Sequence, residues 1–459
     1  MEVVFQGVLD DHFCEDAAST LLCLVMALAE VAIADVSSRP FTAFQGHPDG
    51  EPSNDAEFIK YRPPGIEFFN EARRRLGFSM GECSLEKIQV FILTGLYYET
   101  CSRHMEYWNM IISASLACHT LVTSNSAEIY AAHGDQICRA FWYCSIAEPG
   151  IKQESELLLT GPDELESRIQ LPQFPDHVTM TNELLRVQMY NDSMSHYGEV
   201  FVHNISLRNL AVKIQNELKQ VAEAPIRVPG QTMPGPDDLL RTIVDKLARE
   251  LEQWHGTLPD HLSWDRNLPS TMYTTHDLQS SSPSFYTQSI HVAEAMDALH
   301  SAPMNSFMGS DIANPIVLLA IMRSRYHHIE CILYSPFAYK VLHEHPDNIT
   351  ETDLSATTRF LHACVSWPIM VPPTSQHKRM IPCRYFWSQN ILGALIVLHL
   401  SLINPTLSKI RQSRCRQGFE QEAELTIEWG TAWIRDLKDI DRAAQRCWMI
   451  LKGLYQLDD

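Results

Sequence analysis

Side chains that could bind a metal ion gather in the second half of the chain, at His327, Glu330, His343 and His345. Imidazole and carboxylate groups suit zinc or iron. However, two of the four follow Pro336, and no H-E-x-x-H pattern places two histidines one helical turn apart. We therefore expect these histidines to be hydrogen-bonded or solvated, and we assign no metal site and no cofactor to this chain.

The stretch Gly77–Gly81 fits the pattern G-x-S-x-G, which forms the nucleophile elbow of α/β hydrolases. That elbow requires a buried strand before the serine, whereas the preceding residues Asn70–Leu76 are charged and helical in pattern. A helix that ends at glycine and continues as a loop explains the stretch better. Capping or solvation explains the paired acids Asp237–Asp238 and Asp458–Asp459. We assign no catalytic or cofactor-binding residue and expect that the chain is not an enzyme.

The cysteines are isolated from one another, which bears on zinc binding. They stand at positions 14, 23, 83, 101, 118, 138, 144, 331, 364, 383, 415 and 447. No two are separated by only two residues, so the C-x-x-C pattern of structural zinc sites is missing. Many have apolar neighbours, as Cys23 does, and such cysteines behave as small buried hydrophobic residues. Reduced thiols of this kind are typical of a cytosolic or nuclear compartment.

The charge balance is acidic, with 36 Lys and Arg against 56 Asp and Glu and a net charge of −20. That sign repels phosphate and is unusual for a nucleic-acid-binding chain. Hydrophobic residues make up 45% of the chain, which is enough for a large core. A basic cluster at Lys409, Arg411, Arg414 and Arg416 could contact phosphate or serve nuclear import. We favour a solvated loop after Pro405, because four charges without aromatic partners make a small footprint.

Two apolar runs are long enough to raise the question of a membrane. The run from Ala17 to Ala29 follows acidic residues instead of the basic region of a signal peptide. The run from Ile391 to Ile403 is too short to cross a bilayer comfortably. We therefore expect neither run to be a membrane segment.

Helical periodicity runs through almost the whole chain, and no alternating segment or fixed repeat is present. The predicted helices are 18–34, 66–76, 85–98, 105–121, 184–218, 237–256, 289–299, 312–336, 357–367, 385–402, 422–437 and 440–454. Asp237 is expected to cap its helix and Pro336 to end the one that it follows. The sequence thus predicts an all-α fold, a large bundle of packed antiparallel helix pairs without significant sheet.

The segments 85–98 and 105–121 are predicted to form a helical hairpin that nucleates the core. On the second helix, one face is expected to be buried, and it holds Trp108, Ile111, Ile112, Ser115, Leu116 and His119. Methionine and aromatic side chains nearby could line an effector pocket, but at helical spacing such residues are more often core. A hydrophobic small-molecule site between helices is therefore possible, and its residues stay unknown.

Three groups of residues resemble segments of one protein family. Arg325-Tyr326-His327 followed by Leu333-Tyr334-Ser335-Pro336-Phe337 is similar to the R-Y-H and L-Y-x-P-F of the regulatory region of fungal binuclear zinc cluster transcription factors. Leu258–Trp264 resembles the L-P-x-x-L-x-W that follows a helix in many members. Residues resembling that family's middle homology region are Phe69, Ala72, Arg73, Ser84–Gln89, Gly95–Tyr97, Trp108 and Arg139–Trp142.

This resemblance implies a nuclear protein that controls RNA polymerase II transcription. Transcriptional co-regulators or a homodimer partner, and a small-molecule effector, would be its partners, with no membrane involved. DNA would be bound only through the family's six-cysteine zinc module, which these residues do not encode. The chain departs from the family at Ala117–Leu121, where a Gly-Leu-His turn is usual. The acidic pair and the arginine expected just before Phe-Trp are reduced to Asp135 and Arg139.

By this interpretation residues 1–459 form one helical regulatory region. Residues 1–224 give the best match to the middle homology region, 225–236 and 266–284 are loops, and 237–459 form the C-terminal helical half. One alternative is a helical enzyme or binding protein of secondary metabolism with a hydrophobic pocket, although no cofactor motif or acid–base pair was found. Another is a helical protein-binding scaffold, although fixed repeats are missing.

Overall fold

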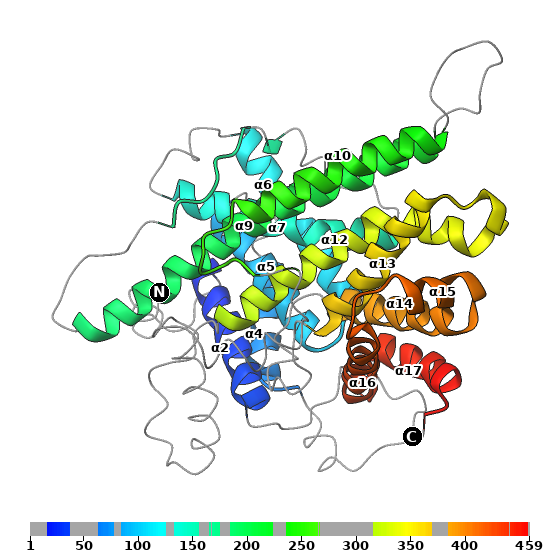
Figure 1. The fold of residues 1–459 in the computed structure, drawn as a ribbon. Helices are drawn as coiled ribbons and strands as arrows, with labels where there is room; N and C mark the ends of the chain where they lie inside the picture. The colour runs from blue at the N-terminus through cyan, green and yellow to red at the C-terminus, as the bar shows by residue number, and fades with distance from the viewer. Residues whose placement is uncertain are drawn as a thin grey trace. The chain divides into compact units, whose positions relative to one another are not determined.

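A computed structural model describes residues 16–36, 63–77, 84–124, 133–155, 165–166, 168–174, 184–223, 236–264, 266, 315–369, 384–439 and 441–457. Within them the chain forms thirteen α-helices and one short 3-10 helix, and no strand (Figure 1). The predicted all-α class is confirmed. The predicted helix 289–299 and the loop 267–284 lie outside the described residues, as does 225–235.

The chain divides into two compact units, each made of separate stretches of sequence. Unit 1 comprises residues 1–173, 373–390 and 431–459, and unit 2 comprises 174–372 and 391–430. Unit 1 contains α2 (Ala17–Val36), α4 (Ile66–Leu76), α5 (Leu85–Thr100), α6 (His104–Ser124), α7 (Gly134–Ser155) and α17 (Arg442–Tyr455). Unit 2 contains α9 (Leu184–Ala222), α10 (Pro236–Gly256), α12 (Pro315–His343), η5 (Pro346–Asn348), α13 (Glu351–Ile369) and α15 (Pro405–Ser413). Helices α14 (Arg384–Ile403) and α16 (Phe419–Leu437) supply residues to both units.

Helices α5 and α6 pack against each other in unit 1, as predicted for a helical hairpin. Gly95 permits the close approach of its two helices, because a Cβ there would lie 3.2 Å from the Cβ of Met110. Phe69 of α4 stacks on Tyr97 of α5, with ring centroids 4.0 Å apart. Such an aromatic pair adds stability beyond the area that it buries. Phe69 and Tyr97, two residues that resemble those of the middle homology region, therefore serve as core contacts.

The predicted buried face of α6 is partly wrong. Leu116 is 55% exposed and Trp108 is only half-buried, its ring edge-on to that of Tyr385. The buried residues of α6 are Tyr107, Ile111, Ala114, Ser115, Cys118, Leu121 and Val122. The helix is apolar around most of its circumference, so periodicity alone could not distinguish the face that meets α5.

Two further predictions are corrected at helix ends. Asp237 does not cap α10, because the helix already begins at Pro236, a residue suited to the first helical position. The predicted loop after Pro405 is the helix α15, in which Asn404 accepts hydrogen bonds from the backbone N–H groups of Thr406 and Leu407. The loop was predicted at a position where proline starts a helix.

Apolar side chains of α9, α10 and α12 form the main core of unit 2. These helices contact one another, and α12 packs most extensively on α13 (Figure 1). Their buried cluster includes Leu247, Leu251, Met322 and Leu333, which are 1% exposed or less. At these burial levels each Leu→Ala change would cost about 2–5 kcal/mol.

Buried cysteines are confirmed for the described part of the chain. Eight of the nine cysteines described there are buried and all nine are free, while Cys14, Cys83 and Cys383 lie outside it.

Among the described residues, two helices are long and apolar enough to span a membrane. They are residues Ala17–Ala34 of α2, of which 44% are buried, and α14, of which 39% are buried. The buried side chains of α2 include Leu24, Ala27 and Val31, which belong to the core of unit 1.

Candidate functional site

The site begins with a proline inside a helix. Pro336 was predicted to end its helix, but α12 continues through it to His343. Proline lacks the N–H that would bind the carbonyl of Ile332. The hydroxyl of Ser335 donates to that carbonyl oxygen instead, at 2.9 Å. This side-chain bond satisfies the orphaned acceptor and explains how the helix passes the proline.

An apolar groove of about 400 Å³ opens beside Pro336 in unit 2. Four helices line it, and none of the lining residues is charged. They are Ser335, Pro336, Ala338, Tyr339 and Leu342 of α12, Phe360 of α13, Val397 and Leu400 of α14, and Leu407 of α15. Small-molecule sites are typically concave, of about 300–1,000 Å³, and lined mainly by apolar and aromatic groups. The groove has that volume and that lining.

A buried cluster of hydrophobic residues supports the groove from within. Leu361, Val365 and Leu398 are fully buried there, and Leu407 belongs both to this cluster and to the groove lining. Because protein interiors are close-packed, groove-lining residues that rest on such a cluster keep their positions. The shape of the groove is therefore fixed by the core of unit 2.

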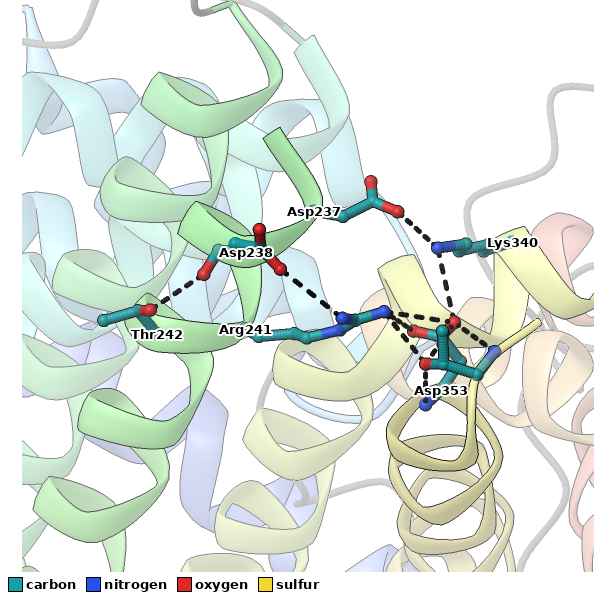
Figure 2. A network of polar contacts seen from close by, with 7 residues as sticks. Asp237, Asp238, Arg241, Thr242, Lys340 and Asp353 are labelled. Atoms are coloured by element: carbon teal, nitrogen blue, oxygen red, sulfur yellow. Dashed lines mark hydrogen bonds and ion pairs between the residues drawn. The ribbon is translucent and has the colours of Figure 1, made fainter. Parts of the chain in front are cut away.

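A charge network fixes the same stretch of α12 to two other helices (Figure 2). Lys340, which follows Tyr339 of the groove, contacts Asp237 of α10 at 2.5 Å and Asp353 of α13 at 3.3 Å. Arg241 of α10 reaches the same Asp353 at 3.3 Å. One buried carboxylate thus accepts from two cations that lie on different helices.

Asp353 also takes part in capping the N-terminus of α13. The backbone N–H of Thr350 donates to its carboxylate at 2.9 Å, and the Thr350 hydroxyl accepts from the N–H of Asp353 at 3.3 Å. This reciprocal pair is a capping box. Burial raises the pKa of Asp353, but hydrogen bonds from Thr350 and the charge of Lys340 outweigh burial, so that the pKa is lowered. For Lys340, burial is outweighed by Asp237 and Asp353, and its pKa is raised.

Few polar groups line the groove. Ser335 and Tyr339 carry its side-chain hydroxyls, and the Ser335 hydroxyl is engaged by the Ile332 carbonyl. A nucleophilic serine needs an adjacent base, and no histidine or carboxylate belongs to the lining. The arrangement suits an uncharged apolar molecule, since the lining supplies no partner for a buried charge.

Two of the three groups of residues that carry the family resemblance meet in the core of unit 2. Trp264, at the end of Leu258–Trp264, lies edge-on to Tyr326, with ring centroids 5.3 Å apart. Trp254 of α10 stacks on Tyr326, with ring centroids 6.0 Å apart. Arg266 donates to the Tyr326 hydroxyl at 3.0 Å, and burial raises the pKa of that tyrosine. The two sequence motifs are thus parts of one packed cluster.

The histidines weighed as metal ligands are in separate places. His327 pairs with Glu330, with 2.8 Å between Nδ1 and Oε2, and lies near Trp264. His343 lies against Tyr339, whereas His345 is exposed and accepts the N–H of Asp347. Among the described residues no group of three or more potential ligands could hold a metal ion.

The basic cluster of residues 409–416 is largely neutralised. Arg411 pairs with Glu420 and Arg416 with Glu422, at 2.5 and 2.7 Å, while Arg414 pairs with Glu351. Paired guanidinium groups are less available to phosphate. Of the other weighed positions, Gly77 lies at the C-terminal end of α4, and residues 78–81 and 458–459 lie outside the described part. Asp238 contacts Arg241 at 3.6 Å.

A second charged cluster, buried in unit 1, was missed by sequence reasoning. His104 has Nδ1 3.0 Å from Glu99 and Nε2 2.9 Å from Asp441. Arg384 donates its backbone N–H to Glu99 at 2.8 Å, and its guanidinium donates to the Glu99 carbonyl oxygen. Asp441 also caps α17 through the N–H groups of Ala443 and Ala444. The available signal was Glu99, an acid within an otherwise apolar run.

Opposing effects set the pKa values in this cluster. Burial lowers the pKa of His104, but the carboxylates of Asp441 and Glu99 outweigh burial and raise it to about 9. Burial raises the pKa of Asp441, and the bond with His104 outweighs burial, so that the pKa is lowered. The imidazole is therefore a cation at neutral pH, held between two buried acids.

A scan of the chain against protein-family models found no match, and searches of curated proteins and of solved structures found no match either.

Proposed function

We propose that the chain is the regulatory region of a fungal binuclear zinc cluster transcription factor, which modulates RNA polymerase II transcription in the nucleus and does not itself read DNA. The observation that supports this most directly is the packing of the resembling segments. Trp264 and Tyr326 come from motifs far apart in the sequence, and their rings pack together. A chance resemblance gives no reason for such motifs to meet in one core.

The groove beside Pro336 gives this proposal a mechanism. It lies in the segment that resembles L-Y-x-P-F and it suits an uncharged apolar effector. A ligand that binds one conformation better than another shifts the population toward it. Helix α12 is suited to respond to a bound ligand, because it contributes residues to the groove, to the charge network of Lys340 and to the aromatic cluster of Tyr326.

A reporter assay tests the regulatory function. The chain is fused to a heterologous DNA-binding domain, and reporter expression is compared with that of the DNA-binding domain alone. We expect a change in expression, of either sign, that requires the chain to be folded. A fusion that is folded, nuclear and without effect would contradict the proposal. Gel-shift titrations of the chain alone should show no sequence-selective DNA binding, because a net charge of −20 opposes it.

The same groove favours a second candidate function, a binding protein of secondary metabolism with a hydrophobic pocket. Thermal-shift measurements with neutral apolar compounds test it, since a ligand at 100 times its Kd stabilises the folded state by about 2.7 kcal/mol. Val397→Trp would fill the groove and abolish the shift. Ile403→Trp is the matched control, because Ile403 is 63% exposed on the same helix and does not line the groove. Binding combined with an inert reporter fusion would favour this second function.

A further inference from the structure

The exposed side of α17 carries an uncommon combination of residues. Arg442, Arg446, Met449 and Ile450 follow one another at spacings that place them on one face of the helix, and we call them the α17 stripe. Met449 is 63% exposed and Ile450 is 46% exposed. The opposite face is buried in unit 1, through Ala443, Ala444, Cys447, Trp448 and Leu451. The helix is therefore held by one face and offers a basic and apolar surface on the other.

The arginines of the α17 stripe have no ion-pair partner in the described part of the chain. Neither Arg442 nor Arg446 makes a side-chain hydrogen bond or ion pair with any residue that the structure describes. Two more cations stand beside the helix, since Arg435 and Lys438 each lie 5.3 Å from the centre of the Trp448 ring. Around α17 the four cations Arg435, Lys438, Arg442 and Arg446 outnumber the two exposed acids Asp436 and Asp439, on a chain whose net charge is −20.

The unpaired state contrasts with other arginines of the chain. In unit 2, Arg411, Arg414 and Arg416 are each paired with a glutamate. In unit 1, Arg139 is paired with Asp135 one turn earlier in its helix. On α17 itself the positions one turn from the two arginines hold no acid, and Asp439, which stands three residues before Arg442, makes no ion pair with that arginine among the described residues. A partner molecule can supply the missing negative charge.

We propose that the α17 stripe binds an amphipathic helix of another protein, one that carries acidic side chains beside an apolar stripe. Its acids would pair with Arg442 and Arg446, and its apolar residues would cover Met449 and Ile450. Helix recognition of this kind uses anchors at successive turns, with charge complementarity setting specificity and encounter rate. The proposal goes beyond the regulatory function and stands without it.

The total charge of the chain favours a short peptide over a polyanion. At physiological ionic strength, exposed charges farther apart than about 8 Å are largely screened from each other. A short acidic helix on the α17 stripe therefore responds mainly to the local cations. A nucleic acid or an anionic membrane extends across much more of the acidic surface and is repelled by it.

Fluorescence anisotropy of the full chain tests the proposal. The probe is a labelled amphipathic peptide of about twenty residues, with Leu at helical spacing on one face and Glu on the flanks. A scrambled peptide of the same composition is the control probe. The variants are Arg442→Glu with Arg446→Glu, and Met449→Ser with Ile450→Ser. The matched control is Lys409→Glu with Arg249→Glu, which makes the same charge change at exposed positions of unit 2.

We expect the amphipathic peptide to bind and the scrambled one to bind far more weakly. Both α17 variants should raise the Kd by about tenfold or more, and the unit 2 control should leave it within about twofold. Circular dichroism should show all variants folded, because every substituted side chain is exposed. Absence of peptide binding, equal binding of the scrambled peptide, or a Kd that the α17 variants do not change would overturn the proposal. Binding of a DNA duplex or of anionic vesicles in place of the peptide, abolished by the same variants, would do so too.

Discussion

The buried histidine of unit 1 allows a quantitative test of how charge stabilises this chain. We expect His104→Gln to destabilise unit 1 strongly, because glutamine can keep a hydrogen bond but removes the cation between Glu99 and Asp441. Both carboxylates are almost completely buried, at 3% and 0% side-chain exposure. Breaking a buried charge pair by removing one partner costs about 3–5 kcal/mol.

The pKa of His104 gives an independent value and a pH dependence. Its folded pKa of about 9 lies above the ordinary 6.5, so the folded state holds the proton more tightly. The resulting stability is fully present below pH 6.5 and is lost as the pH rises through 9, a total of about 3 kcal/mol. Asp441 acts in the opposite direction. Its pKa is lowered, so its contribution is present above its ordinary value of 3.8 and is lost in acid.

Urea unfolding at pH 6, 7.5 and 9.5 provides the assay, followed by hydrogen exchange of the α5 and α6 amides. The wild type should lose about 3 kcal/mol across this range, whereas His104→Gln should be nearly flat and should approach the wild type at high pH. His261→Gln is the matched control, since that histidine makes a 2.7 Å pair with Glu199 but is 40% exposed. A variant as stable as the wild type at pH 6, or one that keeps the full pH dependence, would refute this reasoning.

Other predictions concern packing, capping and metal. Tyr107→Ala should lower the free energy of unfolding by about 3–5 kcal/mol, because Tyr107 is 1% exposed. Trp108→Ala should lower it by clearly less, because Trp108 is half-buried. Equal melting curves of the two variants would contradict the packing of α6. Asp353→Asn should lower the free energy of unfolding in urea by about 3 kcal/mol, because it leaves Lys340 and Arg241 without their shared carboxylate. A decrease below about 0.5 kcal/mol would count against the network. Chelators should leave the melting temperature unchanged, and bound zinc measured after dialysis would show otherwise.

The sequence by itself determined the fold class and the position of most helices. The apolar periodicity of the 66–76 and 85–98 segments was enough, because a helix is a local structure whose hydrogen bonds close within a few residues. Local sequence signals failed where the same residue type is compatible with more than one local structure. Pro336 was predicted to end a helix and a loop was predicted after Pro405, yet Pro336 lies inside α12 and Pro405 begins α15.

Only the tertiary structure decided which residues meet. Glu99 and Asp441 are far apart in the sequence, and they share His104 because two separate helix ends pack together. In the same way, the groove combines residues of α12 with Leu407 of α15, which no spacing within either helix could show. A periodic pattern gives each helix its apolar side, but the choice of partner depends on side-chain shape and charge across the whole unit. The motif of Tyr326 could therefore be found in the sequence, whereas the groove and the buried charges could not.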